Sequence, residues 1–202
     1  MKLYWAPQTR AARAVWMLEE AGVDYDLKRV ELGGPERKDS AEFREASPMG
    51  KVPALIDGDV KMSESSAICL YVADRYSSGN LAPAIDDPLR GKFLYWLMYT
   101  PAVVEPCMSE KFSGADTNRY RAGWGDFDLM IETLEQGIAG KTWILGEQFT
   151  AADVMLGSST VFLRLFDMLP DSPTVSAYAD RCLARPAYQK VLELNASATG
   201  KS

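Results

Sequence analysis

The sequence contains no histidine among its 202 residues. Without an imidazole the chain has no histidine general base and no histidine-containing metal site. Its three cysteines, Cys69, Cys107 and Cys182, are odd in number and widely spaced, and no Cys-x-x-Cys pair occurs. This pattern argues against a disulfide framework and a zinc knuckle, and it is typical of buried thiols in a reducing compartment. We therefore expect no bound metal ion.

Positive charge and long apolar runs are also scarce. Lys and Arg number 22 against 28 Asp and Glu, and the resulting net charge of −6 disfavours nucleic-acid binding, which needs a basic face. The longest apolar run of the second half, residues 93–104, contains Pro101 and is too short to span a bilayer. The first seven residues lack an export-signal pattern. These absences predict a cytoplasmic protein that contacts neither nucleic acid nor membrane.

The first half of the chain alternates short strand patterns and helix patterns. Strands are predicted at residues 3–6, 25–32, 52–56 and 60–62, and helices at residues 11–21, 38–46 and 65–76. A strand–helix–strand crossover gives a parallel pair, and the Asp57-Gly58 hairpin adds an antiparallel edge. This order predicts an α/β fold of the thioredoxin type over residues 1–78.

The second half carries no strand signals. Residues 79–87 contain Gly79, Pro83 and two aspartates with little apolar content, so we interpret them as a linker. Residues 88–202 are then an all-helical domain. Helices are predicted at residues 88–100, bending at Pro101 and Pro106, then from about Asp116, at 150–168, from 173 and at 187–194, with a frayed end over 197–202.

Three local motifs point to one family. They are Pro-Gln-Thr-Arg-Ala-Ala-Arg at 7–13, Gly-Lys-Val-Pro-Ala-Leu at 50–55 followed by Glu-Ser-Ser-Ala-Ile at 64–68, and Phe-Thr-Ala-Ala-Asp-Val at 149–154. Together with the two predicted domains they resemble the cytosolic glutathione transferase family, in particular its bacterial theta-like and beta-like members. The resemblance covers essentially the whole chain. It implies glutathione as co-substrate and a homodimer, for which Tyr71, Arg75 and Tyr76 give a weak local hint.

The second motif predicts the glutathione contacts. Pro53 opens a strand, and a proline in such a turn is often cis, which exposes the Val52 backbone for pairing with an extended peptide at a sheet edge. The resemblance implies that this peptide is glutathione. Glu64 then suits its ammonium group, Ser65 at a helix start suits its γ-glutamyl carboxylate, and Lys51 suits its glycyl carboxylate. The alternative is that Glu64-Ser65 is a plain helix cap.

The group that activates the glutathione thiol is less defined. The resemblance aligns Thr9 with the catalytic serine of theta-like and delta-like classes, and it aligns Arg10, a further candidate glutathione contact, with the cysteine of beta-like members. Thr9 at a helix start can donate to a thiolate and can equally be an N-cap. Tyr4 lies near the tyrosine of the tyrosine-type classes and is the second candidate.

A second pocket should accept an apolar electrophile. We expect it beside the turn at residues 5–7 and the first long helix of the second half, with these lining residues: Trp5, Tyr99, Cys107, Met108 and Phe112. Aromatic residues and methionine at helical spacing are also typical of a helix core, so both interpretations stay open. The Thr150-x-x-Asp153 motif has a structural interpretation only, a capping box.

The leading hypothesis is an enzyme that adds the glutathione thiolate to small apolar electrophiles. The alternative is a glutathione-binding or ligand-binding scaffold of the same fold without turnover. A thiol-disulfide reductase of the omega-like kind would need a cysteine at residues 9–11, and none occurs there. The sequence leaves open the identity of the electrophile, and whether the role is detoxification or a dedicated catabolic step.

Overall fold

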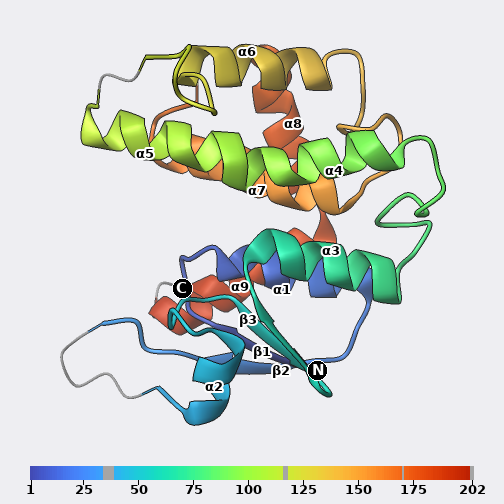
Figure 1. Cartoon of the computed structure of the whole chain (residues 1–202), viewed down its shortest axis with the longest axis vertical. Helices are drawn as coiled ribbons and strands as arrows, with labels where there is room; N and C mark the ends of the chain where they lie inside the picture. Colours follow the sequence, from blue (N-terminus) through green and yellow to red (C-terminus); the bar gives the residue numbers. More distant parts are fainter. Residues whose placement is uncertain (34–38, 116–117, 170, 201–202) are drawn as a thin grey trace. The chain divides into compact units, whose positions relative to one another are not determined.

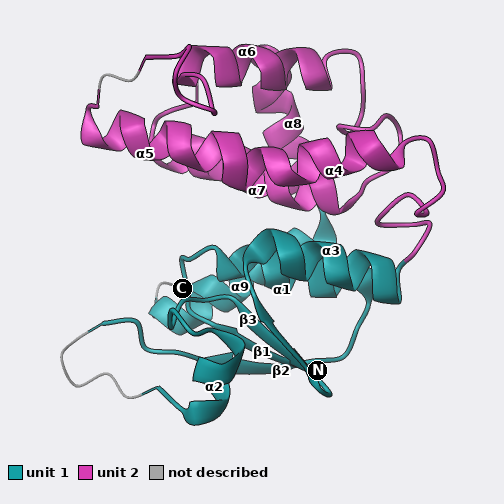
Figure 2. Ribbon diagram, in the orientation of Figure 1, with its two compact units in different colours: residues 1–77, 185–202 teal, residues 78–184 magenta. Residues whose placement is uncertain are grey.

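The computed structural model describes residues 1–33, 39–115, 118–169 and 171–200 (Figure 1). The chain forms two compact units, coloured separately in Figure 2. Unit 1 is Met1–Ser77 together with Arg185–Ser202, and unit 2 is Ser78–Ala184. The segment from residue 185 onward thus packs with unit 1, whereas the sequence-based division grouped it with residues 88–184. Within the described ranges, no helix combines the length and apolar character needed to cross a membrane.

Unit 1 has the predicted strand–helix order followed by one returning helix. Its elements are β1 (Lys2–Trp5), α1 (Ala11–Ala21), β2 (Asp26–Arg29), α2 (Ala41–Ala46), β3 (Ala54–Asp57), β4 (Val60–Ser63), α3 (Ser65–Tyr76) and α9 (Pro186–Thr199). The bounds of α1 and α3 agree with the prediction. The left-handed Gly22, at φ +63°, ends α1, as its position after an alanine-rich and leucine-rich run predicts.

The four strands form one mixed sheet in the order β2-β1-β3-β4. β1 pairs parallel with β2 and antiparallel with β3, and β3 pairs antiparallel with β4. Tyr4 and Ala54, which are register partners, pack with Phe43 of α2 on one face. Because side chains alternate along a strand, the buried pair Leu3 and Leu55 points to the other face, where Figure 1 shows α1 and α3. This confirms the thioredoxin-like topology.

Helix α9 runs to Thr199, so the predicted fraying from residue 197 is wrong for the described part of that segment. Tertiary packing explains the difference. The Tyr188 ring lies edge-on to Trp16 of α1, with centroids 4.6 Å apart, and Arg185 Nη2 donates to Glu20 Oε2 at 2.6 Å. These contacts hold the first part of the helix. Beyond residue 194, where the composition gives no strong signal, Asn195 and Ala198 accept hydrogen bonds from Gln8 and Arg29.

Unit 2 is all-helical over its described residues. Its helices are α4 (Arg90–Tyr99), α5 (Glu105–Ser113), α6 (Phe127–Ile138), α7 (Ala151–Leu165) and α8 (Pro173–Leu183). All of α7 from Ala151 to Thr160 is buried, which makes it the centre of this unit. Its start has the predicted capping box: Asp153 accepts from the Thr150 N–H at 2.9 Å, and the Thr150 side chain accepts from the backbone of Asp153.

Two helix predictions in unit 2 can be compared with the structure. At Pro101, where a bend was predicted after a helix to residue 100, a π-helical turn, Thr100–Val104, carries the backbone from α4 directly into α5. The helix predicted to follow Asp116 begins at Phe127, where the side chain of Asp126 accepts from the Leu129 N–H at 2.8 Å. Asp116 itself lies outside the described residues.

Candidate functional site

Strand register brings the predicted glutathione residues to one end of the sheet. Ala54, the first residue of β3, is paired with Tyr4 near the end of β1 and with Ser63 at the end of β4. The segments that continue from this end are therefore the turn before α1, the 51–53 segment and the start of α3. The site combines three pieces of chain that are far apart in sequence.

The turn before α1 has an unusual backbone. Gln8 is left-handed at φ +56°, and its N–H donates to Asn195 Oδ1 at 2.8 Å. Thr9 Oγ1 accepts from the Ala11 N–H at 3.2 Å, as an N-terminal capping hydroxyl does, and donates to the Ala6 carbonyl at 2.7 Å. The partly buried Thr9 hydroxyl thus sits at the positive end of α1, where a helix favours an anion.

The Val52–Pro53 peptide bond is cis, as predicted. Ser47 Oγ holds the preceding residue in place, since it accepts from the Lys51 N–H at 2.9 Å and donates to the Lys51 carbonyl at 2.8 Å. The main chain of Val52 makes no hydrogen bond to another described residue. One expectation is corrected: β3 is an interior strand, so Val52 is left unpaired by lying just before the strand and not by lying on a sheet edge.

The turn and the 51–52 segment enclose a hollow of about 270 Å³. Four predicted site residues line it: Thr9, Arg10, Lys51 and Val52. Leu32 and Gln8 line it as well. Gln8 belongs to the 7–13 motif but was not predicted as a site residue, and no local signal in the sequence marks Leu32. The hollow has both a helix N-terminus and an unpaired backbone on its walls, which suits a small peptide with an anionic group.

The start of α3 supplies the other half of the site. Glu64 has φ +73° and ψ 116°, a sparsely populated conformation for a residue with a side chain, and its side chain makes no capping bond. Glu64 thus occupies the N-cap position of α3, as the helix-cap alternative predicts, but it caps the helix with its main-chain carbonyl and not with its side chain. Ser65, the first residue of α3, accepts from Arg13 Nη1 at 3.4 Å, and this buried arginine was missed by sequence reasoning. A buried guanidinium adds positive charge at a helix N-terminus, which favours a carboxylate there.

Tyr4 faces away from this turn. Its ring packs against Phe43 of α2 with centroids 5.1 Å apart, and its hydroxyl donates to Glu42 Oε2. Burial, with the hydrogen bond to Glu42, raises the pKa of the Tyr4 hydroxyl. Trp5, the next residue of β1, is also buried and lies on the opposite face of the sheet.

The four helical candidates for the electrophile pocket are divided between core and surface of unit 2. Tyr99 is buried and donates to the Met130 carbonyl at 3.1 Å, and Cys107 is fully buried. Met108 is half-buried, and Phe112 is exposed beside Phe166 with ring centroids 5.1 Å apart. Tyr99 and Cys107 therefore belong to the helix core, and the candidates left accessible are Met108 and Phe112 of α5.

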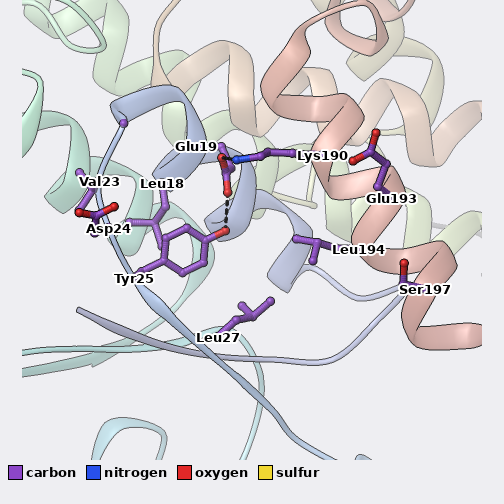
Figure 3. A pocket seen from close by; sticks show the side chains of 11 residues that line it. Leu18, Glu19, Val23, Asp24, Tyr25, Leu27, Lys190, Glu193, Leu194 and Ser197 are labelled. Atoms are coloured by element: carbon purple, nitrogen blue, oxygen red, sulfur yellow. Dashed lines mark hydrogen bonds and ion pairs between the residues drawn. The ribbon is translucent and has the colours of Figure 1, made fainter.

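A second hollow, of about 690 Å³, lies at the other end of α1, against β2 and α9 (Figure 3). Tyr25 Oη donates to Glu19 Oε1 at 2.8 Å, and Lys190 Nζ donates to Glu19 Oε2 at 2.8 Å, so one carboxylate joins α9 to α1 here. No predicted site residue lies in this hollow. Within the described ranges, no group of three or more Cys, Asp or Glu side chains is placed to hold a metal ion.

Comparison with known proteins agrees with this geometry. Residues 1–74 match the model of the glutathione S-transferase N-terminal domain, and residues 117–181 match that of the C-terminal domain. A probable glutathione S-transferase of Oryza sativa subsp. japonica is 30% identical over 96% of both chains. The chain belongs to the glutathione S-transferase family.

Solved structures of family members have the same fold. A glutathione transferase from Methylococcus capsulatus str. Bath is 26% identical, covers 97% of this chain and 98% of its own, and superposes with a TM-score of 0.82. A sphingomonad glutathione S-transferase complexed with glutathione is also 26% identical, with a TM-score of 0.80 over 96% of this chain and 98% of its own. Transferase activity with glutathione as co-substrate is thus supported at the level of the family.

Proposed function

We propose that this chain conjugates the thiolate of glutathione to small apolar molecules with an electrophilic carbon. The observation that carries the proposal is the unpaired Val52 main chain at the wall of the 270 Å³ hollow, opposite the N-terminus of α1. An extended peptide that pairs with this backbone can place its central thiol at the start of a helix. Glutathione is a peptide with that arrangement.

The remaining proposed contacts hold the two ends of the tripeptide. Ser65, at the start of α3 beside the buried Arg13, takes the γ-glutamyl carboxylate, and the exposed Glu64 carboxylate takes the ammonium group. Lys51 takes the glycyl carboxylate, and Arg10 lines the same hollow. Pro53 joins Val52 to the first residue of β3 through a cis peptide bond.

Thr9 is the proposed donor to the thiolate, in preference to Tyr4. The Tyr4 hydroxyl is engaged by Glu42 on the α2 face, whereas Thr9 lines the hollow. The Thr9 proton points to the Ala6 carbonyl in this structure, so donation to sulfur exchanges a neutral acceptor for a charged one. Hydrogen bonds to charged acceptors are stronger, so the exchange is favourable once a thiolate is bound.

Isothermal titration with glutathione tests the binding part. The wild type should bind, and Glu64→Ala should bind about 10- to 150-fold more weakly, because a lost charge-assisted hydrogen bond costs about 1.5–3 kcal/mol. Glu45→Ala, at an exposed glutamate of α2 that pairs with Lys61, is the matched control and should leave the affinity unchanged. Absence of binding by the wild type at millimolar glutathione would refute the proposal.

Turnover with a panel of aryl halides, epoxides and isothiocyanates tests the catalytic part. Thr9→Ala should lower turnover about 5- to 30-fold and raise the thiol pKa of bound glutathione by about one unit, since one donor of about 1–2 kcal/mol is lost while the helix start remains. Tyr4→Phe should leave both quantities near the wild-type values. The reverse result would assign the role to Tyr4 and contradict the proposal for Thr9.

A binding scaffold without turnover is the second candidate. The observation that favours it is that the Thr9 hydroxyl already accepts a hydrogen bond from the Ala11 N–H and donates one to the Ala6 carbonyl, both within the turn. The same two measurements separate the candidates: the scaffold binds glutathione with the Glu64 dependence described above but conjugates no member of the panel.

We also propose a cytoplasmic homodimer. The support is an ordered surface cluster on α3, in which the hydroxyls of Tyr71 and Tyr76 both donate to Asp57 and Arg75 lies 5.8 Å from each ring centroid. Tyrosine and arginine are enriched at protein interfaces. Sedimentation velocity at micromolar concentration should give a species of twice the monomer mass, and a monomer alone would contradict the proposal.

A further inference from the structure

The contact between Asn195 and Gln8 joins the end of α9 to the turn that lines the smaller hollow. Asn195 Oδ1 accepts the Gln8 N–H at 2.8 Å, over a sequence separation of 187. Gln8 is left-handed, a conformation in which the Cβ of an ordinary residue is crowded by the neighbouring carbonyl. Such a residue persists only where its surroundings hold it, and this hydrogen bond is one that does so.

Helix α9 is fixed to α1 on one side of Asn195 and to β2 on the other. Toward its beginning, Arg185 pairs with Glu20 and Lys190 with Glu19, the latter contact drawn in Figure 3. Beyond it, Arg29 Nη1 donates to the Ala198 carbonyl at 3.0 Å. The half-buried Asn195 therefore lies on a part of α9 that is anchored on both sides, and its carboxamide is held by the hydrogen bond from Gln8.

Helix formation alone does not account for an asparagine at this position. Asparagine is a poor helix former in a helix interior, and residue 195 lies within Pro186–Thr199. The hydrogen bond that its side chain makes is the one to Gln8. What residue 195 supplies is an acceptor for a main-chain N–H next to Thr9.

We propose that Asn195 is a positioning residue for thiol activation: its carboxamide holds Gln8 left-handed and so sets Thr9 and the first N–H groups of α1 toward the hollow. This inference rests on the proposed function. Without the acceptor, the Gln8 peptide relaxes, and the donors of Thr9 and the helix start move away from the sulfur position. The ends of glutathione are held by other residues, so its affinity depends little on Asn195.

The test measures the thiol pKa of bound glutathione, from the ultraviolet absorbance of the thiolate, together with the pH profile of turnover. Asn195→Ala should raise this pKa by about half to one unit and lower kcat about 3- to 10-fold at a pH below it. The rate loss should disappear at a pH well above the pKa, where the thiol is ionised in both proteins. The dissociation constant of glutathione should change less than twofold.

Two further variants separate positioning from helix integrity. Thr199→Ala removes a hydroxyl that donates to the Asn195 carbonyl within α9 and leaves the carboxamide in place, so it should keep the wild-type profile. In a Gln8→Gly background, Asn195→Ala should have less than a twofold effect, because glycine adopts the left-handed conformation without support. An equal effect of Asn195→Ala in both backgrounds, or of Thr199→Ala and Asn195→Ala, overturns the inference.

The outcomes distinguish this inference from the proposed function. If the wild type does not bind glutathione, the proposed function and the inference about Asn195 are both refuted. If it binds and ionises glutathione, and Asn195→Ala has the wild-type pKa and pH profile, the inference alone fails. The absorbance measurement needs no electrophile, so a scaffold without turnover still gives a decisive result.

Discussion

Replacing Asp153 by asparagine should change how the stability of the chain depends on pH. The Asp153 side chain is fully buried and accepts four hydrogen bonds: from the N–H of Ile144 and the hydroxyl of Tyr178 on one oxygen, and from the N–H and hydroxyl of Thr150 on the other, at 2.8–3.1 Å. Burial raises the pKa of this carboxyl from 3.8 to about 6, although the four hydrogen bonds act to lower it.

The sign of the effect follows from the direction of that shift. The folded state holds the Asp153 proton more tightly than the unfolded state, so this group contributes stability below about pH 3.8 that is lost as the pH rises through about 6. At about 1.4 kcal/mol per pKa unit, a shift of about two units is worth about 3 kcal/mol. The carboxamide of an asparagine does not titrate. The Asp153→Asn variant should therefore gain about 2–2.5 kcal/mol relative to the wild type between pH 4 and pH 7, whatever its absolute stability, because a small part of the effect is already present at pH 4.

Urea unfolding of both proteins at pH 4, 5, 6 and 7 measures this difference directly. Asp128→Asn, at an exposed aspartate of α6, is the matched control, and its difference from the wild type should not follow the same curve. A stability difference for Asp153→Asn that stays flat, or that falls as the pH rises, would falsify the reasoning, because it would mean that the hydrogen bonds outweigh burial.

Two further predictions concern packing and the thiols. Gly137→Ala should destabilise the chain by about 1–3 kcal/mol, because a Cβ at this position would lie under 3.0 Å from the Trp96 ring. Alanine stabilises a helix where the site has room for it, so a variant that is more stable than the wild type in urea unfolding would contradict this prediction. Burial raises the pKa of Cys69 to about 12 and of Cys107 to about 11, and Cys182 is buried too. A thiol reagent at pH 8 should therefore label the three cysteines only when the chain unfolds. Rapid stoichiometric labelling of the native protein would contradict this prediction.

Local signals were sufficient for much of unit 1. Helix α1 is bounded by its alanine-rich run and by Gly22, and α3 by the strand before it, so both bounds agree with the sequence. Strand β2 was predicted too long, because its alternation of apolar residues continues after its pairing with β1 ends at Arg29. Hydrogen-bonded register is a property of two strands, and one strand's pattern does not determine it.

The features that the sequence did not predict are those decided by tertiary contacts. A bend was expected at Pro101, and the π-helical turn that contains this proline was not. The last helix extends five residues past the predicted 194 to Thr199, where Asn195 accepts from Gln8 and the Ala198 carbonyl accepts from Arg29. In each case the local helix propensity was weak, and tertiary contacts determined the conformation.

The candidate site likewise contains residues that local motifs identify and residues whose role depends on tertiary contacts. The proposed glutathione contacts could be named from the sequence, because Lys51-Val52-Pro53 and Glu64-Ser65 are short motifs whose chemistry is local. Arg13 was missed, because its value to the site comes from burial beside Ser65 across a sequence separation of 52. Gln8 was missed as well, since nothing in its neighbours marks a left-handed backbone at a residue that is not glycine.

Helix α9 packs with unit 1, and this packing explains why part of the candidate site could not be found from local motifs. The matched C-terminal domain ends at residue 181, and the segment from Arg185 onward packs against α1 and reaches the turn at Gln8. Ligand-binding groups can be encoded in a strand end and a helix start, because each carries its own backbone geometry. Holding a strained turn beside them needs an acceptor at a defined place in space, and in this chain that acceptor is presented by the last helix. A sequence motif can therefore suggest the ligand, whereas the turn conformation that we propose for thiol activation depends on a contact that only the folded chain forms.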